Sequence, residues 1–373
     1  MPHKAEPDKT NPAETRMASK NVLVVGTGTI GEPLIAMLSR RRTALGIDRV
    51  MFHKNTPLKH DRSKVWALQR AGAELAVNAE RITAFRNLDI SPTLTFEEAI
   101  EASAVVIDCT PVGNRMKENT YSRYTSPDRL FIAQGSEFGF GHMYARGIND
   151  ETLETALAGK DEKFIQIVSC NTHNLSLLCR VLGFDGEDNV LQEGRFLCMR
   201  RATDISQGDS FIPAPTVGAH SDPQFGTHHA RDAYHLYRTK NIDLNLFSSA
   251  VKLNSQYMHA VYFQIRRNRP IDLDEVIKRF DDDDLTAMSW KDSAATVFSF
   301  GRDHGLYGRI MNQTVIARNT LTVRGGNEVI GFCFTPQDGN SLLSSVAATL
   351  YHLEPSSYTD RIQVLSPYFF DEV

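Results

Sequence analysis

The sequence is poor in cysteine and in long apolar runs, and each shortage narrows the class of protein. Its 373 residues include five scattered cysteines, which argues against a disulfide framework or a zinc site and is typical of a reducing compartment. No apolar run approaches the ~20 residues of a membrane span, and no apolar stretch follows the polar N-terminus as in a signal peptide. A net charge of −4 argues against a nucleic-acid partner. We therefore expect a cytoplasmic protein.

The remaining composition predicts a folded protein with a short tail. Hydrophobic residues make up 41% of the chain and charged residues 23%, a balance that allows a full core, and the length allows two domains. Residues 1–18 are charged and almost free of large apolar side chains, so we expect them to be disordered.

The first half of the chain contains the pattern of a dinucleotide-binding turn. An apolar run, Val22 to Val25, is followed by Gly26, Gly28 and Gly31 in G-x-G-x-x-G spacing, and then by apolar residues at helical spacing. This strand–turn–helix context predicts a pyrophosphate held at a helix N-terminus. The alternative is a tight turn without a ligand.

The second strand, "RVMFHK", bears on the choice of cofactor. In NAD-specific folds this strand usually ends on an acid that binds the ribose 2′-OH, whereas here it ends in "HKNT". Lys54 suits a 2′-phosphate, so we expect NADP or NAD, with NADP slightly favoured. The alternative is that Lys54 is a solvated loop lysine.

Two later strands end in residues that we expect to line the cofactor crevice. "SAVVIDCTPVGN" reaches Asp108 and Cys109, which we interpret as packing residues, and then Thr110, which we place near the cofactor. "RLFIAQGSEFG" ends near Ser136.

Cys170 lies where the strand-like "FIQIVS" turns into a leucine-rich helix, which Asn171 or Thr172 could cap. Free backbone N–H groups and the helix dipole favour a thiolate there. Beside a nicotinamide cofactor, a thiolate suits capture of an aldehyde as a thiohemiacetal, loss of hydride and formation of a thioester. The alternative is a buried structural cysteine.

"SCNT" with its leucine-rich helix resembles the nucleophile motif of the archaeal-type (class II) glyceraldehyde-3-phosphate dehydrogenases. Further matches follow in the family's order, namely "GTGTIG", "VIDCTPVG", "FIAQG", "MRRATD" and "THHARD". The resemblance implies a Rossmann NAD(P)-binding domain, a catalytic domain with a mixed or antiparallel sheet, and a homotetramer. It also implies a small phosphorylated aldehyde or acyl phosphate as substrate.

By this resemblance, residues can be assigned roles position by position. Cys170 is similar to the nucleophile, and the substrate contacts would be Ser169, Asn171, Arg200, His229 and Ala230. The cofactor contacts would be Gly26, Thr29, Ile30, Gly31, Lys54, Thr110, Ser136, Arg201 and Gln337. Ala230 and Ser136 each replace a family glycine, and the loop before His228 is longer than in the family. These departures leave the native aldehyde open.

The two arginines and the histidines can also be interpreted physically. On an alternating strand Arg200 and Arg201 face opposite sides, so we expect one to hold phosphate and the other to lie near the cofactor; the alternative is a pair of surface arginines. We expect His220, His228, His229 and His235 on a loop facing an anionic substrate, and we expect no metal.

We interpret His259, in "LNSQYMHAVYFQIR", as the base beside the thiol. An ungapped alignment would instead place Tyr257 at the catalytic position. The other alternative is a core histidine.

The predicted fold is therefore α/β, with a tail (1–18), a Rossmann domain (19–169), a catalytic domain (170–337) and a C-terminal helix (338–373) that returns to the first domain. The predicted function is an NAD(P)-dependent phosphorylating aldehyde dehydrogenase or, in reverse, an acyl-phosphate reductase. The alternatives are a semialdehyde or phosphonate-aldehyde dehydrogenase, a non-phosphorylating or CoA-acylating enzyme, and a non-catalytic nucleotide-binding protein.

Overall fold

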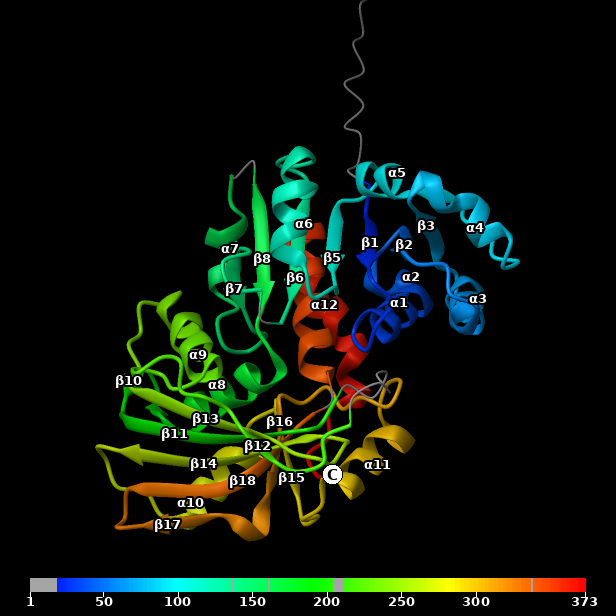
Figure 1. Ribbon diagram of the computed structural model, residues 1–373. Coiled ribbons are helices and arrows are strands. Elements are labelled where there is room, and N and C mark those ends of the chain that lie inside the picture. The colour runs from blue at the N-terminus through cyan, green and yellow to red at the C-terminus, as the bar shows by residue number, and fades with distance from the viewer. Residues whose placement is uncertain (1–18, 136, 160–161, 204–210, 337) are drawn as a thin grey trace, which may run out of the picture.

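The computed structural model describes residues 19–135, 137–159, 162–203, 211–336 and 338–373. Two large sheets form the molecule, one in the upper and one in the lower half of Figure 1. In the described part of the chain, no helix combines the length and the apolar character needed to cross a bilayer.

The first sheet is a doubly wound parallel sheet, as the sequence predicted. Its order is β4-β3-β2-β1-β5-β6-β8-β7, and every pairing is parallel. The strands in chain order are β1 (Asn21–Val25), β2 (Arg49–His53), β3 (Glu74–Val77), β4 (Leu94–Thr95), β5 (Val105–Asp108), β6 (Leu130–Gln134), β7 (His142–Tyr144) and β8 (Lys163–Ile167). Because the strand order reverses between β1 and β5, the crevice for a ligand lies at the carboxyl ends of these strands.

The second sheet is mixed. Its order is β12-β13-β11-β14-β18-β16-β15, with β17 paired to β18. The long central strands β11, β14 and β18 are antiparallel, whereas β13 runs parallel to β11 and β15 runs parallel to β16. Its strands are β11 (Leu191–Arg200), β12 (Thr216–Val217), β13 (Leu246–Lys252), β14 (His259–Arg267), β15 (Thr286–Ser289), β16 (Thr314–Ala317), β17 (Thr322–Arg324) and β18 (Glu328–Thr335). The α/β class with a parallel and a mixed sheet is confirmed.

Helices cover the first sheet and one face of the second. The helices before Cys170 are α1 (Gly31–Arg40), α2 (Arg42–Leu45), α3 (Arg62–Arg70), α4 (Ile82–Arg86), α5 (Phe96–Glu101), α6 (Gly113–Asn119) and α7 (Thr152–Leu157). Those after it are α8 (Cys170–Leu182), α9 (His228–Arg238), α10 (Leu273–Asp281), α11 (Ala294–His304), α12 (Gly339–Leu353) and α13 (Tyr358–Ile362). Buried residues of α8 and α9 share one apolar core with the inner face of the second sheet.

The C-terminal helix α12 runs back along the parallel sheet, where it contacts β5, β6 and β8 (Figure 1). Its buried side chains belong to the same core as β1 and α1. A polar contact fixes its position, because Gln134 at the end of β6 donates a hydrogen bond to Ser345 at 2.6 Å. The first turn of α12 also contacts α8, so this helix links the parallel sheet to the region around Cys170.

The glycine turn gives a stability prediction with a matched control. A Cβ at Gly31 would lie 2.1 Å from the carbonyl oxygen of Gly26, whereas a Cβ at Gly28 would meet nothing within 4 Å. We expect Gly31→Ala to destabilise the protein by about 2–3 kcal/mol, because backbone must move. Gly28→Ala should change stability by less than about 1 kcal/mol. Urea unfolding measures both, and equal midpoints for the two variants would contradict the packing role of Gly31.

Candidate active site

Cys170 begins a helix at the end of a strand, as the sequence predicted. Strand β8 ends at Ile167 and α8 begins at Cys170. The prediction that Asn171 or Thr172 caps this helix was wrong, because both lie inside its first turn. The cap is Ser169, whose backbone is extended and whose hydroxyl accepts a hydrogen bond from the Thr172 N–H at 3.3 Å. The half-buried Cys170 is therefore in the first helical turn, where the dipole favours a thiolate.

Side chains from two distant segments hold the start of α8 in place. The Asn340 amide, in the first turn of α12, donates to the Cys170 carbonyl at 3.0 Å. The Thr335 hydroxyl, at the end of β18, donates to Asn171 Oδ1 at 3.0 Å and accepts from the Asn174 amide at 2.9 Å. All of these side chains except that of Cys170 are buried. The backbone of Cys170 is thus fixed by both α12 and the second sheet.

His259 is the first residue of β14, directly opposite Thr335 in the antiparallel pairing with β18. The same Thr335 bonds the residue after Cys170, so the β-ladder brings His259 to the N-terminal end of α8. Tyr257 lies in the preceding loop, where its 45%-exposed side chain contacts Phe298. Of the two candidates for the catalytic position, His259 is the one that the sheet directs toward Cys170.

One ring nitrogen of His259 is already engaged in a hydrogen bond. The Arg201 backbone N–H donates to His259 Nδ1 at 3.0 Å. Burial, with the nearby positive charges of Arg201 and Arg200, lowers the pKa of His259 to about 3. The ring is therefore neutral at physiological pH, and because Nδ1 accepts, its proton is on Nε2. In this state the free edge of His259 is a hydrogen-bond donor.

The two adjacent arginines have different environments, although the predicted alternation does not apply to Arg201, because the strand ends one residue before it. Strand β11 ends at Arg200, which is exposed, and Arg201 follows it. Arg201 is only 7% exposed, and its guanidinium lies 3.9 Å from the Asp338 carboxylate at the N-terminus of α12. The alternative of two surface arginines is therefore wrong for Arg201.

The histidines expected on a loop are mostly helical. His228, His229 and His235 belong to α9, and only His220 lies in a loop; that prediction was wrong because the helix begins directly after Thr227. His229 is 3% exposed, and among the described residues neither of its ring nitrogens has a hydrogen-bond partner. Burial lowers the pKa of His229, and the nearby groups His228, Arg200 and His259 lower it further, because each would repel a proton added to this ring. A buried imidazole with two unused nitrogens at a helix N-terminus is suited to meet a polar ligand.

Ala230, expected among the substrate contacts, lies beside His229 in the first turn of α9. Its backbone N–H donates to the Ser248 hydroxyl at 3.0 Å, and its side chain is fully buried. This N–H is therefore already occupied by a bond to β13.

The glycine turn and its surroundings fit a dinucleotide. Gly26 has φ +95°, and the space around Gly28 is open. The apolar Ile30 stands at the cap position of α1 and forms no side-chain cap, while the Glu32 N–H donates to the Gly28 carbonyl at 3.0 Å and Pro33 has no N–H. Thr110, after β5, packs against Gly26, and its buried hydroxyl has no hydrogen-bond partner in the described part of the chain. Open space and an unused hydroxyl beside the glycine turn are what a pyrophosphate would meet.

The other predicted cofactor contacts are placed as follows. The Thr29 carbonyl accepts a hydrogen bond from Arg309, which reaches the turn from the loop after α11. Lys54 is not a solvated loop lysine, because it is only 7% exposed and forms an ion pair with Asp61, so that alternative was wrong. Ser136 and Gln337 lie outside the described residues.

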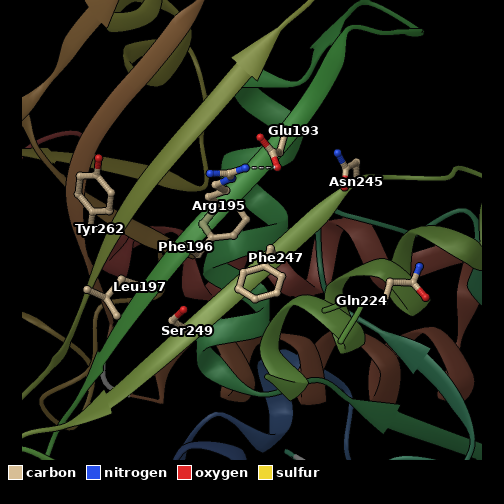
Figure 2. Close-up of a pocket in the computed structure, with 9 residues that line it drawn as sticks. All are labelled: Glu193, Arg195, Phe196, Leu197, Gln224, Asn245, Phe247, Ser249 and Tyr262. Carbon is tan, nitrogen blue, oxygen red and sulfur yellow. Dashed lines mark ion pairs between the residues drawn. The ribbon is translucent and has the colours of Figure 1, made fainter. Parts of the chain in front are cut away.

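A separate depression of about 630 Å³ lies on the open face of the second sheet (Figure 2). Leu197, Phe247 and Tyr262 line it, and Glu193 and Arg195 form an ion pair there at 2.9 Å. None of the predicted site residues lines this depression. The depression faces away from α8 and α9. Side chains alternate along a strand, and Cys198 and Val261, the neighbours of Leu197 and Tyr262, point into the core that α8 and α9 cover.

Sequence reasoning missed four residues that shape the site, namely Asp61, Arg309, Thr335 and Asn340. None of the four belongs to a motif with a recognisable spacing. Each forms its hydrogen bond or ion pair with a residue of another segment, which in most cases is far away in the sequence. The only available signal was the position of Thr335 and Asn340 on either side of the predicted Gln337.

A buried histidine behind Cys170 gives a pH prediction. His173 is fully buried, its Nδ1 lies 3.0 Å from the Ser169 carbonyl and its Nε2 2.8 Å from the Ser344 hydroxyl. Burial lowers its pKa from the ordinary 6.5 to about 4, so only the unfolded chain takes up this proton between those values. The contribution of His173 to the free energy of unfolding should therefore be fully present above pH 6.5. It should be lost as the pH falls toward 4, which lowers the free energy of unfolding by about 3 kcal/mol.

Urea unfolding across this pH range tests the prediction through its slope. In His173→Gln, the number of protons taken up on unfolding between pH 6.5 and pH 4 should fall by about one, so the unfolding free energy should depend less steeply on pH. This holds whatever the substitution does to the stability at neutral pH. His60→Gln, at a side chain that is 77% exposed, is the control and should leave the slope unchanged. An unaltered slope in His173→Gln would show that His173 is not the buried neutral group.

Comparison with known proteins places these features in context. No protein-family model matches the chain. The chain is similar to glyceraldehyde-3-phosphate dehydrogenases of archaea. The protein from Pyrobaculum islandicum is 26% identical over 317 residues, covering 81% of this chain and 83% of the relative. That from Methanopyrus kandleri is 25% identical over 330 residues, covering 83% and 85%. That from Sulfolobus acidocaldarius is 25% identical over 320 residues, covering 84% and 86%.

These matches extend over most of the chain and agree with the resemblance of its motifs. Over most of its length the chain is thus similar to the archaeal-type glyceraldehyde-3-phosphate dehydrogenases.

Proposed function

We propose that this protein is an NAD(P)-dependent aldehyde dehydrogenase that forms an acyl phosphate through a thioester on Cys170. The reverse reaction, reduction of an acyl phosphate, uses the same site. The observation that carries the proposal is the position of Cys170, in the first turn of α8 and fixed by Asn340 and by the sheet that also presents His259. The names of the relatives, which are dehydrogenases of a phosphorylated aldehyde, support it.

The cofactor would lie across the carboxyl ends of β1, β2 and β5. Gly26, Gly28 and the N-terminus of α1 would hold its pyrophosphate, and the buried Thr110 hydroxyl would gain a partner. A bound nicotinamide dinucleotide supplies the hydride acceptor. The buried Arg201 lies 3.9 Å from the Asp338 carboxylate at the N-terminus of α12, whereas Arg200 is exposed. We assign Arg201 to the cofactor side of the site. The cofactor is NADP or NAD, with Lys54 favouring NADP.

The chemistry follows from the protonation states of the two residues. The Cys170 thiolate adds to the aldehyde carbon, and the carbonyl oxygen becomes an oxyanion. His259, neutral with its proton on Nε2, donates to that oxyanion instead of removing a proton from the thiol. The helix dipole lowers the cost of forming the thiolate. Loss of hydride then leaves a thioester, which phosphate attacks to release Cys170.

The substrate's anionic group would bind near His229. Its imidazole is buried without hydrogen-bond partners among the described residues, it stands in the first turn of α9, and the exposed Arg200 is close enough to lower its pKa. A phosphate accepting from the imidazole and the guanidinium would satisfy both. The substrate class that fits best is a small phosphorylated aldehyde.

The covalent step is tested at the nucleophile. We expect Cys170→Ser to reduce aldehyde oxidation by at least about a thousandfold, because a neutral hydroxyl cannot replace the thiolate. Cofactor binding, measured by quenching of protein fluorescence, should be nearly unchanged. Cys109→Ser is the control, because burial and Asp108 raise the pKa of that thiol. Activity of Cys170→Ser within about tenfold of the wild type would exclude the thioester route.

The anion site is tested with paired substrates. We expect His229→Ala and, of the two arginine variants, Arg200→Ala to lower kcat/KM for a phosphorylated aldehyde about a hundredfold, because each removes a charge-assisted or buried contact. The same variants should lose far less on an unphosphorylated aldehyde of similar size. Arg195→Ala, on the open face of the second sheet, is the matched control. Equal losses on both aldehydes for all three variants would assign these residues to the fold or to the cofactor.

A further inference from the structure

A carboxylate between two lysines lies beside the glycine turn. Lys54 Nζ is 2.6 Å from one oxygen of Asp61, and Lys64 Nζ is 3.3 Å from the other. The side chains of Lys54 and Asp61 are only 8% and 15% exposed. Burial raises the pKa of Asp61, but the bonds and charges of Lys54 and Lys64 outweigh it and leave the pKa below its ordinary value. Asp61 is therefore ionised at neutral pH and holds both ammonium groups.

The position of this cluster is set by β2 and by the glycine turn. Lys54 directly follows β2, whose last carbonyl, that of His53, accepts a hydrogen bond from the Gly26 N–H at 3.1 Å. Lys64, from α3, donates to the Thr27 carbonyl inside the turn at 3.3 Å. The three side chains thus lie between the end of β2 and the turn, where a dinucleotide fold receives the adenosine ribose.

The charges in this cluster have opposite preferences for the two cofactors. A carboxylate accepts hydrogen bonds from a ribose diol but repels a 2′-phosphate, whereas ammonium groups attract the phosphate. The end of β2 carries no acid, but Asp61, seven residues after Lys54, brings one to the same place. As long as Asp61 neutralises the two lysines, a 2′-phosphate must compete with it for them.

Building on the proposed function, we propose that Asp61 sets the cofactor choice of this protein, by restraining Lys54 and Lys64 and thereby admitting NAD(H) beside NADP(H). Removing its charge frees the Lys54 ammonium group for the 2′-phosphate and removes the acceptor for the ribose diol. It also loosens the hold on Lys64, which keeps the Glu32 carboxylate at 3.6 Å and the Thr27 carbonyl at 3.3 Å as further partners. Asp61 is thus a specificity-determining residue, with Lys54 and Lys64 as the phosphate ligands.

The experiment measures the dissociation constants of NADH and NADPH by fluorescence titration of the full-length protein, without any aldehyde. For Asp61→Asn, which keeps the size of the side chain, we expect the ratio of the NADH to the NADPH dissociation constant to rise at least about tenfold. Lys54→Ala and Lys64→Gln should lower the same ratio. If Asp61→Asn folds poorly, the same ratio can still be measured for Lys64→Gln, whose substituted side chain is partly exposed.

Asp89→Asn is the matched control. Asp89 pairs with Arg62, the first residue of α3, at 3.2 Å, and its side chain is 80% exposed. Its φ of 56° is tolerated by asparagine, so this variant makes the same charge change near α3 without touching the cluster. The ratio should remain that of the wild type.

The outcomes separate this inference from the proposed function. If both cofactors bind the wild type but the ratio in Asp61→Asn stays within about twofold, Asp61 does not select the cofactor and the inference is wrong. A fall of the ratio in Asp61→Asn would also overturn it, as would equal weakening of both cofactors by Lys54→Ala and by Lys64→Gln. If neither cofactor binds the wild type at millimolar concentration, the proposed function itself fails.

Discussion

The hydrogen bond from the Asn340 amide to the Cys170 carbonyl connects the two halves of the molecule. It joins the first turn of α12, which packs on the parallel sheet, to the first turn of α8, which packs on the mixed sheet. Thr335 completes the connection, because it binds α8 and is the ladder partner of His259. The position of Cys170 relative to both sheets therefore depends on a few buried hydrogen bonds made by amide and hydroxyl groups. Each is costly to break, since its partners would remain buried and unpaired.

Desolvation sets the protonation of the site. Burial lowers the pKa of His173, His229 and His259, and the arginines at the end of β11 add to the effect for the last two. The histidines are therefore neutral donors and acceptors, and the positive charge is left to guanidinium groups and helix N-termini. Such an arrangement attracts an anion and stabilises negative charge as it develops, without a proton that must first be removed.

The sequence allowed the local features to be predicted. The glycine spacing, the strand before it and the strand–helix junction at Cys170 are all contiguous patterns. The errors concern the residues at which helices begin. Ser169, not Asn171 or Thr172, caps α8, and His228 and His229 start a helix, because caps depend on where the backbone becomes extended.

The absence of an acid at the end of β2 was correctly observed, yet it did not reveal the environment of Lys54. Asp61 reaches Lys54 from the next segment, and Lys64 reaches the Thr27 carbonyl from a helix, so neither contact has a fixed spacing. The bond from the Arg201 backbone to His259 is another example, since it fixes the tautomer through strand pairing. Such contacts arise only after the elements have packed.

The late position of α12 in the chain has a consequence for biosynthesis. Strands β5, β6 and β8 leave the ribosome long before the helix that covers them, and so does Cys170 before its anchor Asn340. Domains generally fold as units from the N-terminal side during synthesis. Here the parallel sheet keeps an apolar face uncovered until α12 has been translated. Cys170 likewise gains the hydrogen bond that fixes its backbone only after that helix has formed.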